Sequence, residues 1–343
     1  MKTYYIGADV HCNNTELAVE YDRQIIGRYS VATDIRSIAE VLDQIVGRKH
    51  LVFEEGPMAG WLYRNLKDKV DSLVVCEPRR NRLIAVEGDK DDPIDAGKLA
   101  ALRRGKYLKP VYHTEDEQRL ELKRWVGLYE DRVREATRYI NRIRAQGRMY
   151  GMKIPSSAMK NREACLEWLK TLNNRHLAGR LDLLWIGFEA ARTQTHQAKT
   201  AMMQLVRHYP IIGYWRDLPG IGLIRAVALF AYLDTPFRFR KKSALWKYCG
   251  VGLSRQTSGK DVHGNNKATK LKLEYRCNRK LKNVIVGASR SAIGQKDNPF
   301  RSCYEGLIAV GKKPSNARHT VARQLLTVMW GMWKSGHRYR VGR

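Results

Sequence analysis

Residues 4–11 read YYIGADVH, an apolar run that ends in an aspartate followed closely by a histidine. Comparable runs follow at residues 15–21 and 24–32, and the dipeptides Asn13-Asn14 and Asp22-Arg23 stand between the runs. Short runs of strand-forming residues separated by such turn signals predict an antiparallel meander. We therefore expect the N-terminal part of the chain to be built on a sheet that starts with the first of these runs.

Helices and strands are expected to alternate after the meander. Between Ile35 and Val46 the apolar residues recur at intervals of three and four, which predicts a helix. The other predicted elements are strands at residues 51–54 and 72–76 and helices at residues 61–66, 79–86 and 92–102. A meander followed by alternating helices and strands indicates an α/β domain of the RNase H-like class.

Four acidic side chains stand at the ends of these predicted elements: Asp9, Glu54, Asp92 and Asp95. Asp92 precedes Pro93, the usual order at a helix start, and Asp95 then lies on the same side of the first turn. Carboxylates gathered at one place repel each other unless a cation lies between them, and oxygen ligands in this number suit Mg²⁺ or Mn²⁺. The alternative is that Asp92 is only a helix cap and that Asp9 and Glu54 are only strand-end residues.

The chain is strongly basic. Its 343 residues carry a formal net charge of +29, and the pI is near 10.0. Residues 236–343 contain 25 Lys and Arg against 4 Asp and Glu, a net charge of +21 in this part alone. Such an excess predicts a polyanionic partner, with nucleic acid as the first candidate.

Nothing in the sequence points to a membrane or to secretion. There is no apolar run of about 18 residues, and the N-terminus leads into the first predicted strand without the apolar segment of a signal peptide. None of the six cysteines belongs to a C-x-x-C pair, so neither zinc nor disulfides are expected, and the thiols should be buried or half-buried. We expect a cytoplasmic protein with no membrane partner.

The middle of the chain predicts two long helices. Apolar residues repeat mostly at intervals of three and four from His113 to about Tyr150, and again from about Leu181 to His208. Two such helices joined by a polar segment indicate an antiparallel coiled coil. Packing inside one small bundle would give the same pattern, so pairing between subunits through these helices remains one of two interpretations.

The last domain is expected to open at residues 218–226, which read LPGIGLIRA. A Pro-Gly-x-Gly turn that enters an apolar helix is similar to the hairpin of helix-hairpin-helix modules, in which backbone N–H groups at a helix start bind a DNA phosphate. A plain turn into a helix explains this short motif equally well.

A second chemical stretch follows at residues 254–270, which read SRQTSGKDVHGNNKATK. It is a loop rich in glycine and serine, set among cations. A hydroxyl in it could attack a phosphodiester if its neighbours hold the phosphate and stabilise the developing charge. Ser258, directly before Gly259 and Lys260, is the candidate nucleophile. The alternative is a phosphate-binding loop in which this serine only donates a hydrogen bond.

Taken in order, these motifs resemble those of the DEDD transposases, the insertion-sequence recombinases that include bridge-RNA-guided enzymes and pilin-gene invertases. The resemblance covers nearly the whole chain. The N-terminal motifs are GADVH at 7–11, FEEGP at 53–57 and KDDPIDA at 90–96. The C-terminal motifs are LPGIG at 218–222, FR at 237–238, YCGV at 248–251 and TSGK at 257–260.

The resemblance implies a RuvC-like domain at residues 1–110, a helical coiled-coil linker at 111–210 and a mainly α transposase domain at 211–343. It implies that Mg²⁺, with Mn²⁺ as the alternative ion, is bound by Asp9, Glu54, Asp92 and Asp95. It also implies that Ser258 is a nucleophile that forms a covalent phosphoserine link to DNA.

The partners that the resemblance implies are donor and target DNA, a structured non-coding bridge RNA encoded by the element, and further copies of the chain. The copies would form a homodimer or homotetramer whose composite site joins the RuvC-like domain of one subunit to the transposase domain of another. The expected location is the bacterial cytoplasm, at the nucleoid during action.

Several residue choices remain open within this interpretation. Glu54 and Glu55 are adjacent, and Glu54 is preferred because it precedes x-Gly-Pro. Asp91 adjoins Asp92, which the helix-cap argument favours, and Ser254 or Thr257 could take the role given to Ser258. The rival function is a metal-dependent RuvC-like nuclease, such as a junction resolvase, that activates water. A third class is a non-catalytic nucleic-acid-binding protein, which the four acids argue against.

Overall fold

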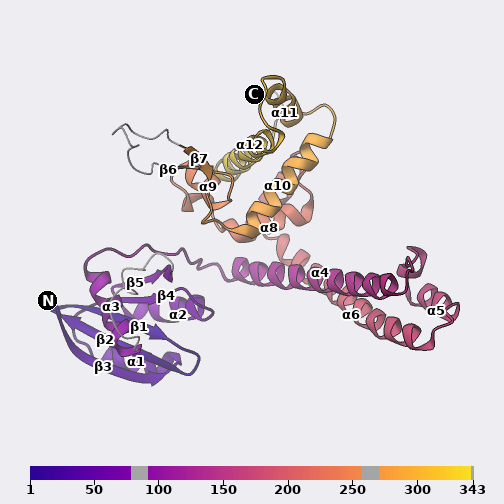
Figure 1. The fold of residues 1–343 in the computed structure, drawn as a ribbon. Coiled ribbons are helices and arrows are strands. Elements are labelled where there is room, and N and C mark those ends of the chain that lie inside the picture. Colours follow the sequence, from indigo (N-terminus) through magenta and orange to yellow (C-terminus); the bar gives the residue numbers. More distant parts are fainter. Residues whose placement is uncertain (79–91, 257–269, 341–343) are drawn as a thin grey trace, which may run out of the picture. The chain divides into compact units, whose positions relative to one another are not determined.

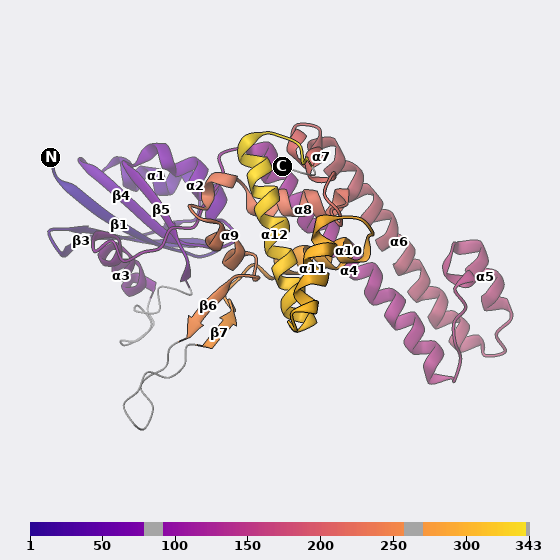
Figure 2. The ribbon, with the colours of Figure 1, turned by 90° about the horizontal axis from the view of Figure 1, so that it is seen from above.

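The computed structural model describes residues 1–78, 92–256 and 270–340, and the chain divides into two compact units (Figures 1 and 2). The N-terminal unit comprises residues 1–115 and the C-terminal unit residues 116–343. The predicted boundary after residue 110 lies close to this division, whereas the predicted boundary after residue 210 falls inside the second unit. The three-domain scheme stays a prediction.

The N-terminal unit is built on a mixed sheet, as the sequence predicts. In its described part the strands are β1 (Thr3–Val10), β2 (Asn14–Tyr21), β3 (Gln24–Ala32), β4 (Arg48–Glu54) and β5 (Ser72–Cys76). They lie in the order β3-β2-β1-β4-β5. The first three strands form the antiparallel meander, while β4 and β5 run parallel to β1. The carboxyl ends of β1, β4 and β5 therefore share one edge of the sheet.

Helices cover both faces of this sheet. They are α1 (Ile35–Asp43), α2 (Ala59–Leu66) with the short η1 (Lys67–Lys69), and α3 (Asp92–Arg104). Alternate residues of a strand point to opposite faces. Ile6 and Phe53 pack in one core with the apolar residues of α1 and α2, whereas Val52 packs on the other face with Leu99 of α3. The two faces of β1 and β4 thus meet different helices.

The ends of α1 have local causes. Asp34 caps its start by accepting a hydrogen bond from the backbone N–H of Ser37 at 2.8 Å. The helix ends at Asp43, three residues before the predicted end at Val46. The N–H of Arg48 donates to the carbonyl of Lys2, so the chain must already be extended there to begin β4. The helix predicted at 79–86 lies outside the described residues.

Two long helices begin the C-terminal unit: α4 (Glu117–Met149) and α6 (Arg175–Val206), with η3 (Ser157–Met159) and α5 (Arg162–Lys170) between them. They are antiparallel, because Leu122 near the start of α4 shares a core with Met202 near the end of α6, while Ile143 shares another with Leu181. The predicted start of α6 at residue 181 is six residues late. Asn174 caps the helix through the N–H of Leu177. A coiled-coil supertwist stays a prediction.

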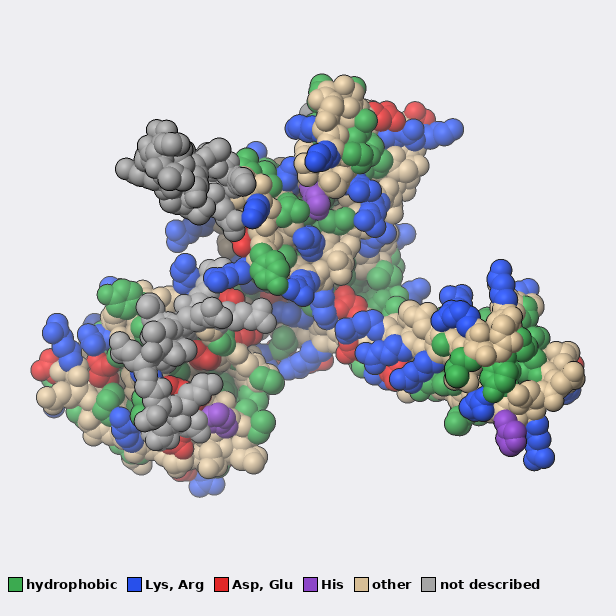
Figure 3. Space-filling view, in the orientation of Figure 1, with side chains coloured by type: hydrophobic (Ala, Val, Ile, Leu, Met, Phe, Trp, Pro, Cys, Tyr) green, Lys and Arg blue, Asp and Glu red, His purple; other side chains and the backbone are tan. Residues whose placement is uncertain are grey.

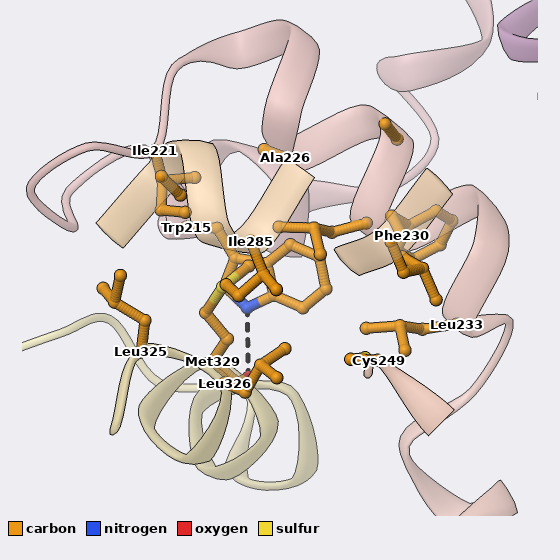
Figure 4. Close-up of a cluster of buried hydrophobic side chains, with 14 of the residues drawn as sticks. Trp215, Ile221, Ala226, Phe230, Leu233, Cys249, Ile285, Leu325, Leu326 and Met329 are labelled. Carbon is orange, nitrogen blue, oxygen red and sulfur yellow. Dashed lines mark hydrogen bonds between the residues drawn. The ribbon is translucent and has the colours of Figure 1, made fainter. Parts of the chain in front are cut away.

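The rest of the C-terminal unit is mainly helical, as expected. Its elements are α7 (Pro210–Trp215), α8 (Leu223–Leu233), η4 (Pro236–Arg238), α9 (Lys242–Tyr248), β6 (Leu253–Gln256), β7 (Lys270–Leu273), α10 (Arg279–Gly294), α11 (Pro299–Ala309) and α12 (Pro314–Ser335). Helix α8 is buried from Ala226 to Leu233 and forms the middle of the core. Figure 4 shows the indole N–H of Trp215, which donates to the carbonyl of Met329 at 3.1 Å inside this core.

Two expectations from composition can be compared with the structure. Among the described helices, none is both long and apolar enough to cross a membrane. All six cysteines are free thiols. Five of them are buried or half-buried as expected, but Cys12 is exposed, because it lies in the turn between β1 and β2.

Candidate active site

Asp9 and Glu54 lie at the same edge of the N-terminal sheet. Asp9 is the last but one residue of β1, and Glu54 is the last residue of β4. The two strands are parallel, and their pairing register ends with Ala8 beside Phe53. The next residue of each strand is therefore the acid, so that the two carboxylates come from neighbouring positions.

The two acids also share a face of the sheet. Gly7 pairs with Val52, and each acid stands two residues further along its strand. Val52 packs against Leu99 of α3. Since residues two apart point the same way, Asp9 and Glu54 lie on the face that α3 covers.

Helix α3 crosses this face in the opposite direction to β1. Arg103, near its end, donates to the hydroxyl of Ser72, the first residue of β5, at 2.7 Å. Ala96, near the start of the helix, lies against Gly7, which belongs to the second half of β1. The helix therefore starts toward the carboxyl edge of the sheet and ends toward the amino edge. Asp95, one residue before Ala96, therefore lies toward the carboxyl edge of the sheet, where Asp9 and Glu54 are.

The acids have cationic or ionisable neighbours. The imidazole Nε2 of His11 lies 3.2 Å from Asp9 Oδ2, and Lys98 Nζ lies 3.6 Å from Asp95 Oδ1. Asp92 opens α3, but its side chain lies outside the described part of the structure. Among the described residues, no three His, Cys, Asp or Glu side chains are grouped closely enough to hold a metal ion.

Glu55 has a different environment from Glu54. Its carboxylate lies 2.7 Å from the imidazole Nε2 of His113, and this imidazole stacks on the ring of Tyr63 at a centroid distance of 5.4 Å. Its backbone N–H donates to the carbonyl of Cys76 at 2.8 Å. Glu55 lies just after β4, and its hydrogen-bond partners are His113 and Cys76. Glu54, the last residue of β4, lies on the same face of the sheet as Asp9.

Sequence reasoning missed another acid at this edge. Glu16 of β2 pairs directly with Asp9 across the antiparallel register, so the two side chains are on the same face. The hydroxyl of Ser30 donates a hydrogen bond to Glu16. The short turn at Asn13-Asn14 fixes this pairing, so the signal was present in the sequence.

The serine stretch lies mostly outside the described residues, Ser258 and Thr257 included. The described chain on either side of it forms the antiparallel hairpin of β6 and β7. At the base of this hairpin the hydroxyl of Ser254 donates to the carboxylate of Glu274, and this hydrogen bond holds the pKa of Glu274 below its usual value. Ser254 therefore has a structural partner within the hairpin.

The turn before α8 is closely packed. Gly220 has φ +79°, and a Cβ atom there would stand 2.3 Å from the carbonyl oxygen of Ala288. Arg225 donates to the carbonyl of Gly220 at 2.7 Å and to the hydroxyl of Ser291 at 2.8 Å. The turn thus joins α8 to α10, which is a packing role; phosphate binding by this turn stays a prediction.

A carboxylate-bearing sheet edge in one unit, followed by a strongly basic helical unit, is characteristic of enzymes that act on nucleic acid. Comparison with known proteins identifies the family. Residues 6–148 match the IS110 DEDD model, described as a transposase, and residues 215–305 match the model described as transposase, IS116/IS110/IS902 family. The chain belongs to the IS110 family of DEDD transposases, a family of enzymes that cleave and rejoin DNA.

One curated relative is the insertion element IS110 uncharacterized 43.6 kDa protein of Streptomyces coelicolor (strain ATCC BAA-471 / A3(2) / M145). It is 25% identical to this chain over 165 residues, which are 47% of this chain and 39% of the relative. The matched stretch thus spans about two fifths of that protein. DEDD family membership implies the use of a divalent metal.

Proposed function

We propose that this chain is a site-specific recombinase of an insertion sequence that cuts and rejoins DNA through a covalent link between Ser258 and a DNA phosphate. One observation carries the proposal: Asp9 and Glu54 end neighbouring parallel strands on one face, and α3 brings Asp95 toward the same edge. In a chain with a net charge of +29, acids gathered in this way need a functional reason.

The proposed metal ligands are Asp9, Glu54, Asp92 and Asp95, and the proposed ion is Mg²⁺ or Mn²⁺. The donor set fits, because all four groups are carboxylates, and hard oxygen donors suit these ions. A bound ion would neutralise charge on the phosphate that is attacked. Lys98 supplies positive charge beside Asp95, and the imidazole Nε2 of His11 lies 3.2 Å from Asp9 Oδ2. Glu54 is preferred to Glu55, because His113 holds the latter.

The proposed chemical step is a transesterification. The hydroxyl oxygen of Ser258 forms a bond to the DNA phosphorus, and the bond from phosphorus to a deoxyribose oxygen breaks. The proton of the serine goes to the departing oxygen, which leaves as a free hydroxyl. The phosphoserine ester conserves the bond energy, so a DNA hydroxyl can later attack it and rejoin the strand.

Partners and location complete the proposal. Donor and target DNA are the substrates, and a bridge RNA of the element guides their choice. Copies of the chain form a dimer or tetramer, in which a RuvC-like domain of one subunit acts with the transposase domain of another. The +21 charge of residues 236–343 supports backbone binding of DNA and RNA. The site of action is the cytoplasm, at the nucleoid.

The test is to trap the covalent intermediate. Purified protein and Mg²⁺ are incubated with a nicked DNA that releases the cut fragment, and the products are separated on a denaturing gel. We expect a protein–DNA adduct whose linked peptide, identified by mass spectrometry, contains Ser258. An adduct on Ser254, Thr257 or a tyrosine would overturn the assignment. Free 3′-hydroxyl and 5′-phosphate ends without an adduct would show a nuclease that activates water.

A further inference from the structure

A cavity of about 450 Å³ lies between α9, α11, α12 and the chain after α12. Three aromatic side chains line it: Trp246 comes from α9, Phe300 from α11 and Tyr339 from the last described residues. The rings of Phe300 and Tyr339 are inclined by only 30°, with centroids 6.4 Å apart. The volume falls in the range of about 300–1,000 Å³ that is usual for small-ligand pockets.

Two cations line the cavity, and none of the described residues that line it is acidic. Arg323 is half-buried and donates to the carbonyl of Val251 at 2.9 Å and to the hydroxyl of Thr320 at 2.8 Å. No carboxylate of the described chain forms an ion pair with it. Burial without such a partner lowers the pKa of Arg323. A half-buried cation of this kind is stabilised by a ligand that brings an anionic group.

Lys242 stands at the exposed side of the same cavity. Its Nζ lies 5.8 Å from the ring centroid of Trp246, and the indole N–H of Trp246 donates to the hydroxyl of Thr327 at 3.2 Å. Gln324, also exposed, adds an amide that can both donate and accept hydrogen bonds. The cavity thus combines flat apolar walls, an amide and two positive charges.

We propose that this cavity binds one unpaired base of a nucleic acid strand, with Lys242 and Arg323 holding the phosphate of that nucleotide. The inference rests on the proposed function, because it assumes that the chain acts on nucleic acid. Unpaired bases are bound by stacking on aromatic side chains and on Arg planes. Figure 3 shows Lys and Arg side chains spread over the visible face of the C-terminal unit, as expected for strand binding. An apolar side chain of a protein partner would leave the two cations uncompensated.

The experiment compares two oligomers of equal charge: a short oligothymidylate and an abasic oligomer of the same length. Fluorescence anisotropy gives the affinity of each for the full-length protein. We expect Tyr339→Ala to weaken oligothymidylate binding by about 5- to 140-fold, because stacking contributes about 1–3 kcal/mol per base and about 1.4 kcal/mol is a factor of ten. Abasic binding should stay unchanged. Tyr339→Phe, which keeps the ring, should bind like the wild type.

Matched controls lie outside the cavity. Tyr275→Ala removes an aromatic ring that is 80% exposed in the same unit, and it should not change the preference for bases. Lys242→Gln should weaken the binding of both oligomers. It should also lower the slope of log affinity against log salt concentration by about 0.7, the value for one phosphate contact on a single strand. Lys241→Gln, at the exposed neighbouring position that does not line the cavity, should have a smaller effect.

A measurement on the unaltered protein makes the test independent of folding effects. A photoreactive thiothymidine oligomer should crosslink to peptides that contain Trp246 or Tyr339. Crosslinks only to other peptides would overturn the proposal. So would an equal loss of affinity for both oligomers in Tyr339→Ala. So would a change in sedimentation of Tyr339→Ala with the base preference intact, which would indicate a docking site for a second copy. If the wild type binds no nucleic acid at low salt, the proposed function fails as well.

Discussion

Gly7 of β1 packs directly against the backbone of α3 at Ala96, in the helix that carries two of the candidate acids. A Cβ atom on Gly7 would stand 1.9 Å from the carbonyl oxygen of Ala96 and 2.7 Å from the backbone nitrogen of Ala100. Both obstacles are backbone atoms, which cannot rotate away. The position of α3, and with it that of Asp95, therefore depends on the absence of a side chain two residues before Asp9.

Gly7→Ala is expected to displace α3. Overpacking of this kind costs about 1–3 kcal/mol, and the upper end applies here because backbone must move. DNA cleavage should fall more than stability does, since the helix carries two of the proposed metal ligands. The matched control is Gly97→Ala in the same helix, where a Cβ meets Ile25 at an ordinary 3.7 Å. That variant should be as stable as the wild type or more so by about 0.5–1 kcal/mol. Thermal unfolding and cleavage assays measure both.

The adjacent glutamates provide a test of the acidic site. Glu54→Gln should abolish cleavage in Mg²⁺, as should Asp9→Asn, Asp92→Asn and Asp95→Asn, while folding and nucleic-acid binding persist. Removing one negative charge from an edge of the sheet that carries several carboxylates should not harm the fold. Glu55→Gln should keep cleavage, because this residue hydrogen-bonds to His113. Full activity in any two of the aspartate variants, or a greater loss in Glu55→Gln than in Glu54→Gln, would contradict the assignment.

The sequence predicted the N-terminal sheet well because each strand is a short apolar run between turn signals. The run at 4–10 and the turn Asn13-Asn14 together determine the register that places Glu16 opposite Asp9. The contact of Gly7 with Ala96 was beyond sequence reasoning, because it depends on how two distant segments cross. A glycine in a strand signals only that a close approach exists, not its partner.

The C-terminal unit was less predictable. Strands β6 and β7 read LSRQ and KLKL, which are too short and too polar to stand out from a loop. The cavity beside α12 draws its walls from Trp246, Phe300 and Tyr339, which are far apart in the chain and share no local pattern. The early start of α6 had a usable signal, since Asn174 precedes the apolar positions Leu177 and Leu181 at helix spacing.

Stability at alkaline pH should depend on Tyr232. Its hydroxyl donates to Glu130 at 2.8 Å and accepts from Lys280 at 2.9 Å, and burial raises the pKa of Tyr232 to about 12. An unfolded tyrosine titrates near pH 10, so the folded state retains the proton longer. The raised pKa of Tyr232 stabilises the folded state fully below about pH 10. About 2 kcal/mol of this stabilisation is lost as the pH rises toward 12.

Denaturant unfolding between pH 9 and 12 checks this for the wild type and Tyr232→Phe. The variant should be about 1 kcal/mol less stable at neutral pH, because it lacks the hydroxyl hydrogen bonds. It should then lose less stability than the wild type above pH 10. Tyr275→Phe, at a position that is 80% exposed, serves as the control and should follow the wild type. If the free energies of unfolding of the wild type and Tyr232→Phe fell in parallel above pH 10, the raised pKa of the buried hydroxyl would be contradicted.

Nucleic-acid binding should weaken steeply with salt. Residues 236–343 carry a net charge of +21, and each phosphate contact contributes about 0.9 to the log–log slope on B-DNA. The affinity for duplex DNA and for structured RNA is measured over a range of KCl concentrations. A DNA slope shallower than about −3 would mean only about three phosphate contacts, which is too few for a broad basic surface.

The last prediction concerns the cooperation of the two units. Ser258→Ala should bind DNA and RNA but form no covalent complex, and Asp9→Asn should be equally inactive for a different reason. A serine hydroxyl is a poor nucleophile unaided, so its attack should need the acidic site. The proposed composite site takes its serine and its acids from different subunits. A mixture of the two inactive variants should therefore recover part of the wild-type cleavage, measured as adduct on nicked DNA.

Ser254→Ala, which removes the donor to Glu274, is the control serine and should still form the adduct. A mixture as inactive as its components, although both variants bind DNA and form mixed oligomers, would place serine and acids within one subunit.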